Sequence, residues 1–257
     1  RAVPWRGALA LGLLAALAGT ASAQGPTFAS LAADLDTDDL DVVSSALDAL
    51  AATRSQAAVG PIAARIGRGL PPPLVVPAVE ALELIGHPSA APILIRLLRH
   101  RDAAVRAAAA AALAECAPRR AGRPLRAALS DLDADVRASA ALALGRVRDR
   151  RAAGDLFRAL ERGLLEASGS LGQLADVAGI ERLLGYLQRL PLRALTPGLT
   201  EALARRDLPY ALKLEIVARV EDLGSPEAKR YLDELVLLFG DAPLAGAARA
   251  AARRIDP

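Results

Sequence analysis

Residues 102–145 decide the fold, and they read DAAVRAAAAAALAECAPRRAGRPLRAALSDLDADVRASAALALG. One pattern occurs twice in this stretch: Asp102 and Arg106 are followed 31 residues later by Asp133 and Arg137. Alanine and leucine, which favour helices, fill most positions after each arginine. A fixed period of this length in helix-forming sequence is typical of stacked helical repeats. The sequence therefore predicts an all-α fold, an α-α superhelix or solenoid.

Two apolar positions extend the repeat toward the N-terminus. In each repeat a valine is followed eight residues later by a leucine, and on a helix the two side chains lie on nearly the same face. The pairs predict the core-facing positions of four successive helices. The valines are Val42, Val76, Val105 and Val136, and the leucines are Leu50, Leu84, Leu113 and Leu144.

Further helices are expected between and after these four, which gives about seven helical pairs. Pro71-Pro72-Pro73 predicts a rigid break before the helix of Val76, because proline cannot continue a preceding helix. Gly163, Gly169 and Gly172 predict a short or bent helix, since each glycine costs about 1 kcal/mol relative to alanine. The expected helices cover residues 57–66, 90–100, 121–130, 152–162, 180–190, 192–205, 209–223, 226–239 and 243–255.

Composition narrows the chemistry. Apolar residues make up 53% of the 257 residues and aromatic residues only 3%, so the core must consist of Leu, Ala, Val and Ile. The net charge is +3, with 32 basic and 29 acidic residues, so the chain as a whole is nearly neutral and nucleic-acid binding is not expected. Cys116 is the single cysteine and cannot form an intramolecular disulfide. Its alanine-rich surroundings predict a buried, unreactive thiol.

The first 24 residues have the order of a secretory signal peptide. Arg1 and Arg6 precede an apolar run over residues 8–18, and Ala21-Ser22-Ala23 follows as a small-residue cleavage site. An apolar run of this length covers about half of a bilayer core, so it does not predict a membrane anchor. We expect residues 1–23 to be removed before Gln24, and residues 24–257 to form a periplasmic or secreted solenoid without a membrane span.

The repeated pattern resembles a known family. Residues 131–145, with their Asp-x-x-x-x-Val-Arg run and later Ala-Leu-Gly, resemble HEAT repeats of the short, phycobilisome-lyase-like bacterial class. The turn at residues 224–228 (GSPEA) is similar to a turn of that family, and Lys213 stands where its arginine would be. The first two repeats depart from the pattern, with Val43 and Pro77 in the arginine position. In this family the aspartate and arginine form a structural ladder along the stack. The resemblance implies that role for Asp102, Arg106, Asp133 and Arg137.

Some proteins with this type of repeat are enzymes, but the sequence offers little catalytic chemistry. Hydroxylases on HEAT scaffolds hold metal with His-Glu pairs, whereas His87 and His100 are not followed by glutamate. The serines of residues 44–45 and 168–170 lack an evident histidine and carboxylate to activate them. No phosphate-binding glycine loop after a strand is present. No catalytic residue, metal or cofactor is therefore predicted.

One charged feature remains as a candidate partner-binding edge. Residues 96–162 contain 15 arginines and eight acids, whereas residues 24–50 carry six aspartates and no base. Arg119-Arg120 and Arg150-Arg151 lie 31 residues apart, so they should stack along one edge of the solenoid. We call these four residues the arginine edge. They can attract an acidic partner or a polyanion, or they can simply be solvated turn residues.

Together these patterns predict a non-catalytic scaffold outside the cytoplasm that binds another protein. The prediction follows from the extended surface of stacked repeats and from the missing catalytic groups. Two alternatives stay open: a lyase-like enzyme or a subunit of an enzyme complex, and a polyanion-binding module that uses the arginine edge.

Overall fold

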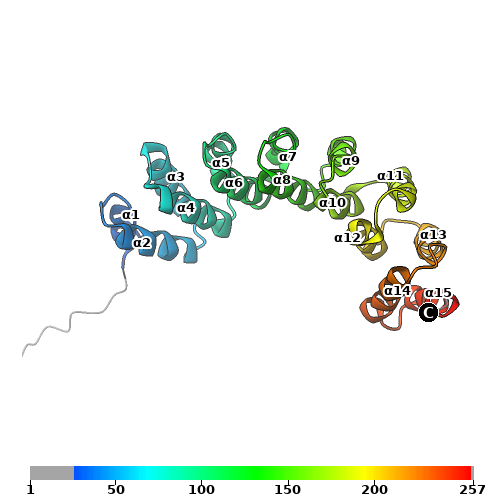
Figure 1. Ribbon diagram of the computed structural model, residues 1–257. Helices are drawn as coiled ribbons and strands as arrows, with labels where there is room; N and C mark the ends of the chain where they lie inside the picture. The colour runs from blue at the N-terminus through cyan, green and yellow to red at the C-terminus, as the bar shows by residue number, and fades with distance from the viewer. Residues whose placement is uncertain (1–25, 256–257) are drawn as a thin grey trace, which may run out of the picture.

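The computed structural model describes residues 26–255, which fold into fifteen α-helices and three short 3-10 helices, with no strand among these residues (Figure 1). The α-helices are α1 (Phe28–Asp34), α2 (Leu40–Ala52), α3 (Gln56–Arg68), α4 (Pro72–Ile85), α5 (Ala91–Leu97), α6 (Ala103–Cys116), α7 (Pro118–Ala128), α8 (Ala134–Arg146), α9 (Ala153–Glu161), α10 (Glu166–Leu174), α11 (Val177–Leu184), α12 (Leu192–Ala204), α13 (Tyr210–Glu221), α14 (Pro226–Phe239) and α15 (Pro243–Arg254). The 3-10 helices are η1 (Pro88–Ala90), η2 (Arg150–Ala152) and η3 (Gly185–Gln188).

The predicted signal segment, residues 1–23, lies outside the described residues. Across residues 26–255, every helix is too short or too polar to cross a lipid bilayer.

The helices form two layers along an arc. Helices α2, α4, α6, α8, α10 and α12 pack side by side in series on the inner side of the arc, and α3, α5, α7, α9 and α11 lie on its outer side (Figure 1). Helix α15 packs against α13 and α14 at the C-terminal end. Each helical pair thus contacts mainly its neighbours, as in a solenoid. The predicted all-α superhelix is confirmed.

The repeat register is correct for α6 and α8 and wrong for the helices before them. Val105, Leu113, Val136 and Leu144 are all buried, as predicted, but the side chain of Leu84 is 48% exposed. The corresponding buried residues of α4 are Leu74 and Leu82. In α2, Leu50 is buried, but Val43 rather than Val42 faces the core.

Prolines explain the shift in α4. Pro71 is the N-cap residue, and Pro72 and Pro73 form the first turn of the helix. Proline fits there because the first amides of a helix have no partner within it. The three prolines therefore start the helix instead of forming a separate break, and the core positions come two residues earlier than the valine spacing indicated.

Aspartates start three inner helices. Asp39, Asp102 and Asp133 are the N-cap residues of α2, α6 and α8, and each carboxylate accepts backbone N–H bonds from the first turn. The Oδ1 atom of Asp102, for example, lies 2.9 Å from the amide nitrogen of Ala104. Such caps stabilise a helix start by about 1 kcal/mol.

Helix α10 is short, as the glycines predicted, but the glycines have a further role. A Cβ atom on Gly172 would lie 2.1 Å from the carbonyl oxygen of Gly198 in α12, so only glycine fits there. Buried Ser168 supports the same junction, because its hydroxyl donates to the Leu195 carbonyl and accepts from the Gly198 amide. The glycines therefore allow the backbones of α10 and α12 to approach closely.

Candidate functional site

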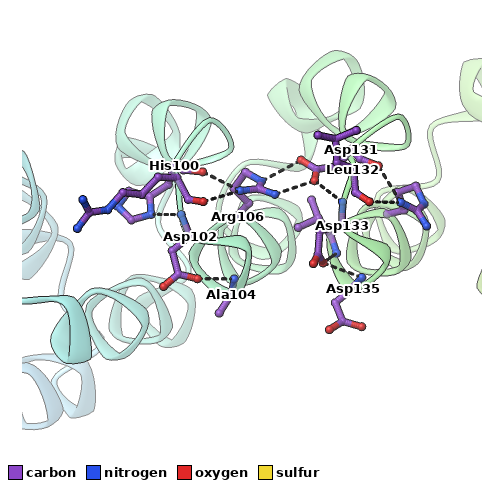
Figure 2. A network of polar contacts seen from close by, with 11 residues as sticks. His100, Asp102, Ala104, Arg106, Asp131, Leu132, Asp133 and Asp135 are labelled. Carbon is purple, nitrogen blue, oxygen red and sulfur yellow. Dashed lines mark hydrogen bonds and ion pairs between the residues drawn. The ribbon is translucent and has the colours of Figure 1, made fainter.

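The strongest polar link between repeats joins Arg106 of α6 to Asp131 in the turn before α8. The Nε and Nη2 atoms of Arg106 donate to the two carboxylate oxygens of Asp131 at 2.9 and 2.8 Å (Figure 2). Both side chains are about 15% exposed. The hydrogen bonds from Arg106 hold the pKa of Asp131 below its usual value. This bidentate pair ties one helical pair to the next.

A second set of contacts is common to several repeats. The Nη1 atom of Arg106 donates to the carbonyls of His100 and Arg101, and Nη1 of Arg137 donates in the same way to those of Asp131 and Leu132. Lys213, at the same distance from the start of α13, donates to the carbonyl of Arg205. A cation four residues after the N-cap thus binds backbone carbonyls of the preceding turn.

The acid of the ladder was predicted at the wrong position. Asp102 and Asp133 use their carboxylates to cap their own helices, so the acid that binds Arg106 is Asp131. Asp131 begins the family-like Asp-x-x-x-x-Val-Arg run, but the residue 31 positions before it is His100, so the repeat pattern assigned the role to Asp102 and Asp133. The predicted positions of Arg106 and Arg137 agree with the structure, since both arginines bind the turn that connects two helices.

Arg137 has no ion-pair partner in the next repeat, within the described residues. The turn that corresponds to Asp131 reads Arg162-Gly163-Leu164. Among the described residues, Arg137 has hydrogen bonds only from Nη1, and it forms no ion pair. A hollow of about 520 Å³ opens beside it, with Arg162, Asp135 and Glu166 among its lining residues. We call this hollow the Arg137 pocket.

The arginine edge is solvent-exposed. Arg119 and Arg120 lie in the first turn of α7, which has no side-chain cap, and Arg150 and Arg151 lie in η2, which contacts α7. Arg150 approaches Asp207 at 3.6 Å, with 71% and 50% of the two side chains exposed. A pair this exposed contributes at most about 1 kcal/mol. The contact between α7 and η2 places the two arginine pairs in neighbouring elements, and all four side chains are exposed.

Groups with catalytic potential have structural partners. The Nδ1 atom of His87 accepts from the Ser89 amide and lies 2.8 Å from its hydroxyl, in the turn that starts η1. Cys116 is buried, and burial raises its pKa to about 11, so its thiol is protonated near neutral pH. Residues 26–255 contain no group of three or more potential metal-ligating His, Cys, Asp and Glu side chains.

The inner helices also present an exposed face, on the side away from the outer layer. Leu142 of α8 is 48% exposed on it, and half-buried Ala111 of α6 is at the equivalent position, 31 residues earlier. Leu84 of α4, also 48% exposed, lies one turn further along its helix and beside Glu115. Glu115 and Arg146 lie one turn beyond Ala111 and Leu142, with 3.9 Å between their charged atoms. We call this surface of α4, α6 and α8 the inner face.

Comparison with known proteins agrees with the repeat pattern. A family model described as HEAT repeats matches residues 74–145 and 97–163, which together span about a third of the chain. No curated protein matches the sequence.

Solved structures share the fold. A chain from the complex of CpcE and CpcF of phycocyanin lyase from Nostoc sp. PCC7120 is 21% identical, with a TM-score of 0.52. The match covers 91% of this chain and 97% of that one. A homology model of the full-length AP-3 complex in an intermediate open conformation is 13% identical, with a TM-score of 0.50 over 88% of this chain and 49% of that chain. Residues 74–163 match the family model of HEAT repeats, and residues 26–255 form an α-solenoid whose fold is similar to that of a phycocyanin lyase chain.

Proposed function

We propose that this protein is a non-catalytic scaffold that binds another protein through the inner face. The observation that carries the proposal is the exposed apolar surface on three adjacent helices, made by Leu84, Ala111 and Leu142. Charged side chains lie beside these apolar groups: Glu80 is one turn before Leu84, and Glu115 and Arg146 are one turn after Ala111 and Leu142. An exposed apolar patch with a charged rim is typical of a protein-binding surface.

Replacement of the two leucines tests the inner face. The variant with Leu84→Glu and Leu142→Glu should lose a partner that the unaltered chain captures from a cell-envelope extract. Its thermal melt should change little, because both side chains are already half exposed. The control is Leu237→Glu on α14, whose side chain is 84% exposed and which should keep the partner. Equal capture by all three proteins would show that the inner face is not the binding site.

We also propose that the protein functions outside the cytoplasm, with residues 1–23 as a cleaved signal peptide. The support is the order of positive charge, apolar run and small-residue site in the sequence. Cell fractionation with N-terminal sequencing of the product tests this. A cytoplasmic product with residues 1–23 intact would contradict the proposal.

A second candidate function is a subunit of an enzyme complex. It is favoured by the fold similarity to a chain of phycocyanin lyase, which was solved as a complex of two proteins. The Arg137 pocket supplies converging polar groups, but its acids and arginines have no nucleophile among them that is activated by a neighbouring base. Identification of the captured partner as an enzyme would favour this function over that of a simple scaffold.

A polyanion-binding module is the third candidate, and the arginine edge supports it. Arg119 and Arg120 lie at the positive end of the α7 dipole, where anions are favoured. Retention of the protein on immobilised heparin at 150 mM salt would support this candidate, and elution below that concentration would count against it.

A further inference from the structure

Arg106 and Arg137 occupy equivalent positions but have different partners. In both residues Nη1 binds two carbonyls of the preceding turn, so the two guanidinium groups are held in the same way. The remaining Nε and Nη2 atoms of Arg106 bind the carboxylate of Asp131. The same two atoms of Arg137 have no hydrogen-bond partner among residues 26–255. The fork of donors that suits a carboxylate is therefore open.

A second cation borders the same space. Arg162 lines the Arg137 pocket, and its Nε donates to the carbonyl of Arg158 at 3.1 Å. Neither Arg137 nor Arg162 has an ion-pair partner in the described part of the chain. Both cations line the same space, so each attracts an anion that enters it.

The surroundings favour a single carboxylate over a polyanion. Asp131, Asp135 and Glu166 also line the pocket, and Asp131 is already bound by Arg106, so a ligand with several phosphates would meet three carboxylates on the same walls. Leu132, next to Asp131 in the chain, is 98% exposed, and Leu165, next to Glu166, is 43% exposed. Leu129 and Leu164 line the pocket itself, so its wall suits a ligand with apolar groups beside its charge, as in a protein segment.

We propose that the Arg137 pocket binds an aspartate or glutamate side chain of a partner protein, which takes the place that Asp131 has in the preceding repeat. The proposal rests on the proposed function, because it requires a protein partner. It adds a chemical class of ligand and a second contact region, at the turns that precede α8 and α10.

A pair of matched peptides tests the site on the full chain. The probes are acetyl-Leu-Asp-Leu-amide and acetyl-Leu-Asn-Leu-amide, which differ only in the carboxylate. Binding is followed by NMR on the Nε–H signals of the arginines at low salt. The aspartyl peptide should bind about fivefold more tightly than the asparaginyl peptide, since a bidentate arginine–carboxylate pair exceeds a neutral contact, and it should shift the Arg137 signal. Equal affinity of the two peptides would overturn the proposal. Equal displacement of the bound aspartyl peptide by inorganic phosphate and by acetate would also overturn it.

Charge reversal in the pocket provides the second arm. Arg162→Asp places a carboxylate on the pocket wall and should abolish the preference for the aspartyl peptide. Arg249→Asp makes the same change of charge on exposed α15 and should retain it. If Arg162→Asp fails to fold, Arg162→Ser removes the cation alone and should weaken the preference. A preference that persists in the folded Arg162 variant would overturn the proposal.

The Glu166→Gln variant tests whether Glu166 of the chain itself is the acid that binds Arg137. If Glu166 were the missing acid, its replacement would lower the melting temperature as much as Asp131→Asn does, and the proposal would fail. We expect an unchanged melt and an equal or tighter aspartyl peptide complex.

Partner capture separates this inference from the proposed function. If the chain captures a protein but does not prefer the aspartyl peptide, only the inference about the Arg137 pocket is wrong. If it prefers the aspartyl peptide but captures no protein, the proposed protein partner is wrong and the carboxylate site remains.

Discussion

The junction between α6 and α8 and the junction between α10 and α12 both place two inner helices side by side, but with different residues. Between α6 and α8, small side chains such as those of Ala109 and Ala140 are fully buried, and the Arg106–Asp131 pair links the adjoining turn. Between α10 and α12, Gly172 and Gly198 bring the backbones into contact, and the buried hydroxyl of Ser168 bridges the helices. The two junctions show that one stacking geometry is compatible with either a polar link or direct backbone packing.

The largest effect is expected at the glycine junction. Gly172→Ala should destabilise the protein by about 3 kcal/mol, because its Cβ would overlap a backbone carbonyl that cannot move aside easily. The control is Gly60→Ala in α3, where a Cβ meets nothing within 4 Å, and it should be neutral or stabilising. Chemical denaturation of both variants measures the difference. Equal stability of the two would mean that α10 and α12 are farther apart than described.

The polar link should contribute less. Asp131→Asn should reduce the free energy of unfolding by about 1–2 kcal/mol, because it replaces a charged, bidentate partner of Arg106 with a neutral one. A double-mutant cycle with Arg106→Gln isolates the pair, and the double variant should be little worse than either single variant. Fully additive effects would contradict the pairing.

The same link predicts a pH dependence. The folded protein lowers the pKa of Asp131 below the ordinary 3.8, so the folded state favours the charged carboxylate. The stabilisation is therefore complete above about pH 4 and is lost as the pH falls through the lowered pKa. The stability difference between the unaltered protein and Asp131→Asn should shrink below pH 4, in urea titrations at several pH values. A constant difference would contradict the assigned pKa direction.

Arg137 should matter less than the Arg106–Asp131 pair. Arg137→Ala removes two hydrogen bonds to carbonyls but no carboxylate contact, so we expect a loss of about 1 kcal/mol. Thermal melts compare it with Asp131→Asn. A larger loss for Arg137→Ala than for Asp131→Asn would indicate an additional partner for Arg137 within the chain.

The smallest effect on stability is expected at the arginine edge. Replacement of Arg119, Arg120, Arg150 and Arg151 with serine should leave the melt nearly unchanged, because all four side chains are exposed. If the edge attracts an acidic partner, association should slow in the variant, and the difference should vanish at high salt. Equal association rates at low and high salt would show that these arginines are only solvated turn residues.

The fold was predictable where one repeat copies another. The match between residues 102–113 and 133–144 fixed the architecture and the registers of α6 and α8, since both helices start at a capping aspartate. The register of α4 was not predictable from its valine and leucine, because three prolines moved its start. Gly172 was identified as unusual, but its contact with Gly198 depends on two helices coming together, which local sequence does not describe.

The candidate site was predictable only in part. The cations Arg106 and Arg137 were found because they repeat. Asp131 was part of the family-like run, but its pairing with Arg106 was missed because Asp131 does not repeat. Contacts between repeats are made by residues that lie 21 or more positions apart. A pattern that occurs once gives no indication of such pairs. The inner face was missed for a related reason, since exposed Leu84 was assigned to the core.

The position of the Arg106–Asp131 pair also affects how such a chain can gain repeats by duplication. A segment of 31 residues, 102–132, contains a capping aspartate, the arginine and the acid that the arginine binds. A tandem copy of this segment would bring both halves of its own link and would need no compensating change in its neighbours. Because each repeat contacts only the next, the array can lengthen by duplication of whole units. A repeat without the acid, as at residue 162, leaves its arginine available for a different ligand.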